Sequence, residues 1–326
     1  MKLFNVNAAR VRNQFMLRPF VSLAILLVLA LPLAAHSETG VSNNKILLGQ
    51  SAAFTGPSSA FGTEMRLGAQ TYFAYINSLG GIHGRQIELR SLDDGDEPAR
   101  TEANTKKLIE TDGVFALFGY VGAATSTTAL PIFTEAEVPF FGAFTGVESL
   151  RRLNRFVFNI RASDFDETEK IVDQLVRIGI KRIAVFYQND AYGTAGLAGV
   201  EKAMSKRDLK IFASAAAARN SSDVAAAVNT ILSAKPDTII MISSYQSCAE
   251  FVRQARKVVS ASQFYSVSSV GSMALAEKLG AESAGIAMSQ VVPLPLSPSV
   301  PVVKEYQQLM AKAGNMDFTF TSLEGF

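Results

Sequence analysis

Short apolar runs alternate with stretches of helical periodicity from Lys45 onward, and this alternation constrains the fold more than any other feature. Several runs, such as 114–120, are apolar almost throughout. Strands that are apolar on both faces are typical of parallel sheets buried between helices. The runs predicted to form strands are 45–50, 86–92, 114–120, 139–144, 155–160, 181–188, 209–214, 236–243, 263–269 and 285–292.

Helical patterns separate these runs and complete an α/β alternation. In 63–79, apolar residues recur with a period near 3.6, and Gly80 and Gly81 follow where the helix should end. Gly179 is expected to close another helix in the same way. The predicted helices are 63–79, 97–113, 166–179, 192–207, 221–234, 245–258 and 301–314. The chain is therefore expected to form an α/β fold.

Chain length and two breaks in the pattern indicate two lobes. A chain of 326 residues is longer than one core usually supports. One boundary is expected near 159–164, and a second at 291–301, where four prolines prevent regular structure. We expect lobe 1 to comprise 38–160 and 293–326, and lobe 2 to comprise 161–292. The chain ends in the middle of a pattern, so the C-terminal part of lobe 1 is interpreted as incomplete.

The segment 1–37 has the layout of a secretory signal peptide. Basic residues precede a run from Phe20 to Ala35 that is almost wholly apolar, and Ser37 closes the segment beside small residues. A basic region, a short apolar core and small residues at the exit define such peptides. We predict a cleavable signal that directs the chain to the periplasm or the exterior. An uncleaved signal anchor is the alternative.

The net charge changes sign without this segment. The chain has 31 basic and 29 acidic side chains, and four of the basic ones precede residue 37, so 27 − 29 leaves a charge of −2. No cluster of Lys and Arg typical of nucleic-acid binding remains. We therefore expect no nucleic-acid partner.

The signatures of common exported enzymes are missing. The chain has no GxSxG, HExxH or CxxC pattern. His83 lies between glycines in an expected turn, and the single cysteine, Cys248, is interpreted as a small buried hydrophobe. The acidic stretch 92–98 lacks the spacing of an EF-hand and is interpreted as a solvated loop rather than a Ca²⁺ or Mg²⁺ site. We expect no enzymatic activity, metal or cofactor; an exported α/β hydrolase that uses His83 is the alternative.

Loops rich in Gly, Ser and Thr follow three of the predicted strands, at 51–62, 119–126 and 142–149. Ligands of open α/β sheets bind outside the carboxyl ends of the strands, where free amides at helix N-termini attract anions. The first loop lacks the GxxxxGK[ST] pattern of a phosphate loop. A carboxylate suits these loops as well as a phosphate does, and Thr125 and Ser126 are predicted to lie beside it.

Several stretches together resemble a known family. They are ILLGQSAAFTGPSSAFG, DDGDEPARTEANTKKLI, VPFFGAFTG, RIAVFYQNDAYGTAGL and DTIIMISSYQSCAEFVRQAR. Their order is similar to that of type I periplasmic solute-binding proteins, in particular the Leu/Ile/Val-binding class that serves ABC importers. The resemblance runs from about Lys45 to the end of the chain. It implies two Rossmann-like lobes with parallel sheets, joined by a hinge and closing on a small ligand.

The resemblance also implies ligand contacts. It places Phe61 in an aromatic wall, and Ala123, Ala143 and Thr145 around an α-carboxylate and part of an α-amino group. The tyrosines of the second lobe correspond to Tyr192 and Tyr245, which also suit a ligand wall because each follows a predicted strand. An apolar wall residue corresponds to Phe320.

One position departs from the family pattern. Amino acid binders of the class carry an acid after the strand that here reads QFYSVSS, and this chain has Ser268 there. A serine supplies no charge-assisted bond to a ligand ammonium. A carboxylate without an amine therefore competes with an amino acid as the expected ligand.

These features together predict a solute-binding protein. We expect a monomer that delivers a small carboxylate or amino acid to the membrane permease of an ABC transporter. A ligand-sensing domain of a signalling receptor is the alternative among binding proteins.

Overall fold

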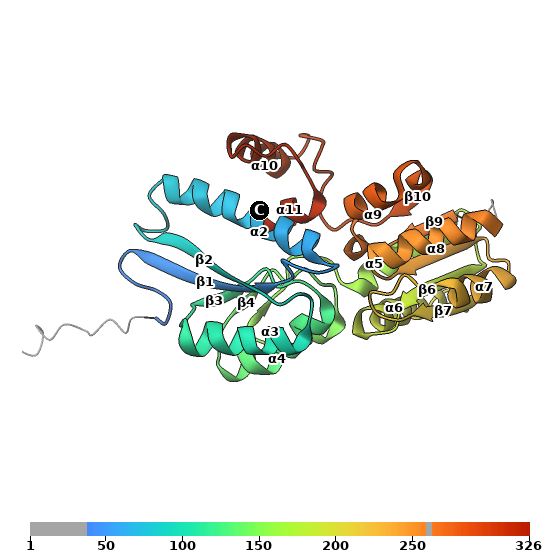
Figure 1. The fold of residues 1–326 in the computed structure, drawn as a ribbon, viewed down its shortest axis with the longest axis horizontal. Coiled ribbons are helices and arrows are strands. Elements are labelled where there is room, and N and C mark those ends of the chain that lie inside the picture. Colours follow the sequence, from blue (N-terminus) through green and yellow to red (C-terminus); the bar gives the residue numbers. More distant parts are fainter. Residues whose placement is uncertain (1–37, 259–262) are drawn as a thin grey trace, which may run out of the picture. The chain divides into compact units, whose positions relative to one another are not determined.

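The computed structural model describes residues 38–258 and 263–326. Within them, Thr39–Phe326 forms one compact unit (Figure 1). The predicted signal peptide at 1–37 lies outside the described residues.

Two five-stranded sheets form the framework of this unit, and every strand pairing in them is parallel. The first sheet has the order β2-β1-β3-β4-β5 and the second the order β10-β9-β8-β6-β7. Read from its own first strand, each sheet follows the same doubly wound order, 2-1-3-4-5. The strands are β1 Lys45–Ala52, β2 Gln86–Asp93, β3 Ala116–Phe118, β4 Phe140–Phe141, β5 Val157–Phe158, β6 Ile183–Gln188, β7 Ala213–Ala217, β8 Thr238–Ile242, β9 Gln263–Ser266 and β10 Ile286–Met288.

Helices connect successive strands, as parallel pairing requires. The α-helices are α2 Ser59–Ser78, α3 Pro98–Lys106, α4 Ala123–Glu135, α5 Asp164–Arg177, α6 Ala191–Ser205, α7 Ala225–Ser233, α8 Tyr245–Val258, α9 Ser272–Leu279, α10 Pro301–Lys312 and α11 Phe320–Gly325. The predicted α/β fold of two lobes with parallel sheets is confirmed. We call the β1–β5 sheet with its helices the first lobe, and the β6–β10 sheet with its helices the second lobe.

The last part of the chain lies against the first lobe. Figure 1 shows α10 and α11 beside α2, and Val303, Tyr306 and Met310 of α10 form a buried cluster with Leu323 of α11. The side chain of Leu67 on α2 packs against this cluster. The predicted division into 38–160 with 293–326, and 161–292, stays a prediction.

Local sequence explains several helix ends. Ser163 caps α5, since its hydroxyl accepts from the amide of Asp166 while the Asp166 carboxylate accepts from the amide of Ser163. After α5, Gly179 has a φ of 87°, the left-handed conformation that commonly ends a helix. The predicted stop at Gly179 is confirmed.

Several elements differ from the sequence expectation: the helices α4, α9 and α11 are absent from the prediction, and one strand is displaced. Helix α4 was not predicted, because its sequence AATSTTALPIFTE is rich in Thr and contains Pro131, both unfavourable in helix interiors. Tertiary packing decides the helix instead, since Ala129 and Phe133 are buried in the core of the first lobe. The strand predicted at 209–214 lies later, at Ala213–Ala217, where it pairs with β6.

Candidate functional site

A pocket lies where the carboxyl ends of both sheets meet. Its volume is about 650 Å³ with the open mouth included. The first lobe contributes Ser58, Phe61, Asp96, Val121, Gly122, Ala123, Ala124, Phe144 and Thr145, and the second lobe contributes Gln188, Asp190, Tyr192, Arg219, Asn220, Ser243, Ser244, Tyr245 and Ser269. All lie at or beyond the carboxyl end of a strand, as is usual for ligands of doubly wound sheets.

The N-terminus of α4 lies against this pocket. Gly122 precedes the helix with a φ of 100°, a conformation that glycine adopts readily. The first helical amide with a carbonyl partner is that of Ser126, which donates to Gly122 O at 3.1 Å. The amides of Ala123 and Ala124 donate to no group in the described residues. Free amides and the positive end of the helix dipole make this a suitable place for a carboxylate.

Aromatic rings form one wall of the pocket. Phe61 stacks on Phe144, with ring centroids 5.4 Å apart, and meets the edge of Tyr245 at 6.1 Å. Phe61 and Phe144 belong to the first lobe and Tyr245 begins α8 of the second, so an apolar ligand here contacts both lobes.

The second lobe presents polar groups from the N-terminus of α6. Asp190 caps this helix, because its Oδ1 accepts from the amides of Tyr192 and Gly193. The Tyr192 hydroxyl accepts from the Ser269 hydroxyl at 3.0 Å. Burial raises the pKa of Tyr192, and the hydrogen bond from Ser269 only partly offsets it, so the phenol stays neutral and can donate to a ligand.

An ion pair crosses from one lobe to the other at this pocket. Arg219 follows β7 of the second lobe, and its Nη2 lies 2.9 Å from Oδ1 of Asp96, which follows β2 of the first lobe. The same nitrogen donates to the carbonyl of Asp96. Neither Arg219 nor Asp96 was predicted from the sequence to line the pocket. The rule that located the other loops also covers residues 217–224 between β7 and α7, so it would have nominated Arg219.

Five of the eight residues predicted to bind ligand line the pocket together. They are Phe61, Ala123, Thr145, Tyr192 and Tyr245. They come from five different strand-to-helix connections, which the two sheets bring to one place.

The other predicted positions lie outside the pocket lining. The Thr125 hydroxyl donates to the carbonyls of Val121 and Gly122 at 2.5 and 3.0 Å and so braces the start of α4. Ser126 and Ala143 are buried within the first lobe. Phe320 lines a neighbouring smaller pocket on the other side of Phe61 and Phe144.

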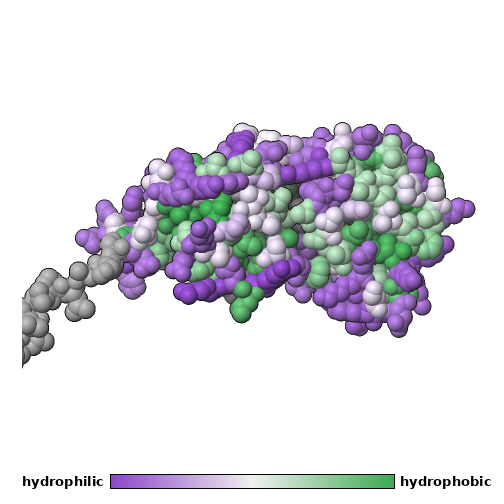
Figure 2. Space-filling view, turned by 90° about the horizontal axis from the view of Figure 1, so that it is seen from below, coloured by the Kyte–Doolittle hydropathy of each residue, from purple (hydrophilic) through white to green (hydrophobic). Residues whose placement is uncertain are grey.

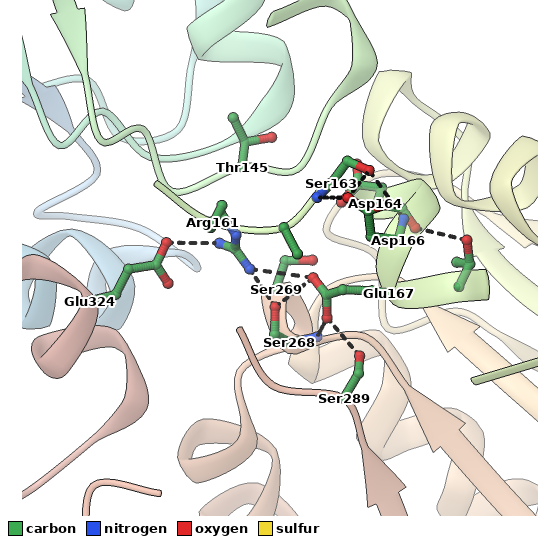
Figure 3. A network of polar contacts seen from close by, with 12 residues as sticks. Thr145, Arg161, Ser163, Asp164, Asp166, Glu167, Ser268, Ser269, Ser289 and Glu324 are labelled. Carbon is green, nitrogen blue, oxygen red and sulfur yellow. Dashed lines mark hydrogen bonds and ion pairs between the residues drawn. The ribbon is translucent and has the colours of Figure 1, made fainter. Parts of the chain in front are cut away.

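Ser268 belongs to a buried network rather than to the pocket (Figure 3). Its amide and hydroxyl both donate to the Glu167 carboxylate at 2.8 Å, and its hydroxyl accepts from Arg161. Ser289 donates to Glu167 at 2.6 Å. An acid therefore lies beside Ser268, supplied by α5 rather than by the chain after β9. Because Glu167 precedes Ser268 by 101 residues, the residues that follow β9 in the sequence give no indication of this acid.

Arg161 holds the centre of this network, where the chain passes from β5 to α5. Its Nη2 and Nη1 lie 3.5 Å from carboxylate oxygens of Glu167 and Glu324 respectively. Its guanidinium also lies 4.5 Å from the ring centroid of Phe144, the pocket wall residue. The network thus connects the passage between the lobes to the pocket wall.

Burial perturbs the acids around Arg161. It raises the pKa of Asp164 to about 7, although the positive charge of Arg161 opposes the shift. It also raises the pKa of Glu324, again against the charge of Arg161. Among the described residues, Oδ2 of Asp164 has no hydrogen-bond partner.

The acidic loop predicted to be solvated is largely tied into the fold. Partial burial opposes the ionisation of Asp93, but hydrogen bonds from the Thr55 hydroxyl and the Phe54 amide prevail and lower its pKa. Asp94 is buried and accepts from the Ser51 hydroxyl at 2.8 Å. In the described part of the chain, no group of three or more His, Cys, Asp or Glu side chains is arranged to hold a metal ion.

The two other side chains singled out from the sequence lie outside the pocket. His83 is exposed in a turn with a φ of 51°. Cys248 is buried, as predicted, and burial raises its thiol pKa to about 12. A thiol with so high a pKa is a poor nucleophile.

The surface of the described unit mixes hydrophilic and hydrophobic residues. Figure 2 shows hydrophilic side chains over much of the face seen from below, with hydrophobic groups between them. Among residues 38–258 and 263–326, no helix has both the length and the apolar character needed to cross a membrane.

Comparisons with known proteins agree with this architecture. The family model described as "Periplasmic binding protein" matches residues 45–326. A possible leucine/isoleucine/valine-binding protein from Rhodopirellula baltica has 36% sequence identity and a TM-score of 0.83, over 90% of this chain and 80% of that chain. A substrate-binding periplasmic protein from Ralstonia solanacearum has 32% identity and a TM-score of 0.82, over 86% and 81%.

The similarity to a curated relative covers a smaller share of both chains. The Leu/Ile/Val-binding protein homolog 7 of Brucella abortus is 26% identical over 248 residues, or 71% of this chain and 60% of the relative. The chain spans about half of the length of the first curated relatives it matches, from 43% to 60%.

Proposed function

The chain belongs to the periplasmic binding protein family, and from this premise we propose that it captures a small amino acid or other carboxylate and delivers it to the permease of an ABC transporter. The observation that carries the proposal is a pocket lined from both lobes, with the amides of Ala123 and Ala124, which have no acceptor in the described residues, on one side and the hydroxyls of Tyr192 and Tyr245 on the other.

In the proposed complex, the ligand carboxylate accepts hydrogen bonds from the α4 amides and the Thr145 hydroxyl. Its apolar part lies against Phe61 of the first lobe and Tyr245 of the second. Tyr192 adds a polar contact from the second lobe. Since neither lobe alone supplies all of these groups, affinity depends on closure of the lobes about their connecting segments. Thr125, Ala143 and Ser268 support the lining from behind it.

The ligand leaves unchanged in this proposal. The relatives named above are described as binding proteins. We propose export by the signal at 1–37, action in the periplasm or exterior, and a monomeric state, which size-exclusion chromatography with light scattering measures directly.

The primary experiment is a thermal-shift screen of amino acids and organic acids, followed by calorimetry of the hits. A bound ligand should raise the unfolding temperature in a concentration-dependent way, because it binds the folded state only. Mass spectrometry of the ligand after overnight incubation should recover it intact. Turnover of the ligand, or no stabilisation by any small carboxylate, would contradict the proposed function.

A further inference from the structure

Arg219 lies beside the two carboxylates that line the pocket. The acids that line the pocket are Asp96 and Asp190. The Arg219 guanidinium lies 2.9 Å from Oδ1 of Asp96, by Nη2, and 3.7 Å from Oδ2 of Asp190, by Nε. A fixed protein cation therefore already pairs with both acids.

Donors from the protein satisfy the remaining oxygens of the two acids. Oδ1 of Asp190 accepts from the amides of Tyr192 and Gly193 at 3.0 and 3.1 Å, and Oδ2 accepts from the Gln188 side chain at 2.7 Å. The negative charge of Asp190 also lies at the positive end of the α6 dipole. An entering ammonium would have to displace these donors.

Protein donors also contact both carboxylate oxygens of Asp96. Its Oδ2 accepts from the Ser58 hydroxyl at 3.0 Å, and its Oδ1 pairs with Arg219. Asp96 and Arg219 are both more than half buried, so their charges are screened less than those of a surface pair. The Asp96–Arg219 pair has no net charge, and Asp190 leaves one negative charge beside it.

Two backbone amides and one buried hydroxyl at the pocket have no hydrogen-bond partner in the described residues. The amides of Ala123 and Ala124 have no acceptor in the described residues. Independently, Oγ of Ser243 is fully buried, lines the pocket and has no hydrogen-bond partner in the described residues. Buried polar groups are almost always satisfied, so the two amides indicate that the ligand supplies acceptor atoms, and the Ser243 hydroxyl, which can donate or accept, indicates a further polar contact.

We infer that Arg219 is a specificity-determining residue: by holding Asp96 in an ion pair and lying beside Asp190, it keeps both carboxylates from pairing with a ligand ammonium, and so selects amine-free carboxylates with an apolar body over α-amino acids. The inference rests on the proposed function and narrows its ligand class. It does not depend on Ser268, which lies in the Arg161 network.

The test compares ligands that differ only in the amino group. Calorimetry measures the dissociation constants of L-leucine against 4-methylpentanoate and of L-phenylalanine against 3-phenylpropanoate. Wild-type protein should bind at least one amine-free acid more than tenfold more tightly than its amino acid partner. In Arg219→Gln, Asp96 loses its counter-charge, so the ratio should move toward the amino acid by about tenfold or more.

Three variants control this result. Arg219→Lys keeps the positive charge and should keep the wild-type preference. Asp96→Asn combined with Arg219→Gln should abolish the gain in amino acid binding. Arg182→Gln breaks a surface ion pair with Asp237 and should leave the ratio unchanged.

Each outcome decides between explanations. If wild-type protein prefers the amino acids, the inference is wrong and the proposed function stands. If Arg219→Gln raises the dissociation constants of amino acids and amine-free acids by the same factor, Arg219 only holds the lobes together. The inference is then also wrong. If folded wild-type protein binds neither class nor any other small carboxylate, the proposed function itself fails.

Discussion

The two lobes share one strand order but bury their sheets to different extents. In the second lobe, every residue of β8 is buried, and Phe186 of β6 stacks on Phe251 with ring centroids 4.3 Å apart. In the first lobe, β4 and β5 have two residues each, and Phe141 and Phe158 remain 42% and 48% exposed. Strand order follows from the crossover connections, whereas burial depends on what packs on each face. A shared topology therefore does not impose equal packing.

The lobes are more alike where helices approach the strand ends. A Cβ on Gly62 of α2 would lie 1.9 Å from the Ala53 carbonyl oxygen, and one on Gly193 of α6 would lie 1.9 Å from the Gln188 carbonyl oxygen. Both helices follow the first strand of their sheet. The repeated unit thus has the same close approach of helix to strand end beside the pocket in both lobes.

The largest test of the contrast is a matched pair of phenylalanine truncations. Phe186→Ala should lower the free energy of unfolding by about 3–5 kcal/mol, because it removes a fully buried ring and leaves a cavity. Phe158→Ala should cost about 1 kcal/mol or less, since that ring is half exposed. Urea denaturation measures both values. Equal losses would show that Phe158 is packed as tightly as Phe186.

A second test concerns the passage between the lobes. The folded pKa of Asp164, about 7, exceeds its unfolded value of about 3.9, so the folded state binds more protons between these pH values. The stability due to this group is fully present below about pH 4 and is lost as the pH rises through 7, a loss on the order of a few kcal/mol. Asp164→Asn should flatten this decline in denaturation experiments from pH 5 to 8.

Asp166, two residues away, provides the control. Hydrogen bonds from the amide and hydroxyl of Ser163 lower its pKa, so the stability it contributes is present above its unfolded pKa and is lost on acidification. Asp166→Asn should therefore reduce stability at neutral pH and leave the decline toward pH 8 intact. The same slope in wild-type protein and Asp164→Asn would refute the role assigned to Asp164.

A third test addresses the likeness of the lobes beside the pocket. Gly62→Ala and Gly193→Ala should each cost about 1–3 kcal/mol of stability, because the added methyl group forces the helix away from a carbonyl oxygen. Thermal denaturation of the two variants provides the comparison. A large cost at one position and none at the other would break the proposed equivalence.

The smallest expected effects concern ligand affinity. Thr145→Ala in the first lobe and Tyr192→Phe in the second should each weaken binding of the identified ligand by about 1 kcal/mol, the usual value of one hydrogen bond. Tyr265→Phe removes a hydroxyl outside the pocket and serves as the control. If only one of the two substitutions lowers the affinity measured by calorimetry, the lobe that carries the other one closes without contacting the ligand.

Much of the fold could be predicted from the sequence, because hydrophobic periodicity depends on residues that are neighbours along the chain. The apolar run at 239–242, within the strand predicted at 236–243, correctly predicted the buried strand β8, and Gly179 correctly predicted the end of α5. Helix α4 was inaccessible, because its Thr-rich sequence and Pro131 oppose a helix and only core packing stabilises it.

Only part of the candidate site could be predicted from the sequence. The rule that ligands bind beyond the carboxyl ends of strands located the loops of Phe61, Ala123 and Thr145, which the structure brings to one pocket. It could not distinguish Thr145, which lines the pocket, from Thr125, whose hydroxyl bonds to the backbone of its own helix.

By itself, the sequence determined the alternation of strands and helices and the loops that meet at the pocket, because these depend on neighbours along the chain. Only the tertiary structure decided the electrostatics. Ser268 lies beside Glu167, 101 residues away, and Asp96 pairs with Arg219, 123 residues away. Charges interact through space with a strength set by distance and burial, and neither is legible in the order of residues.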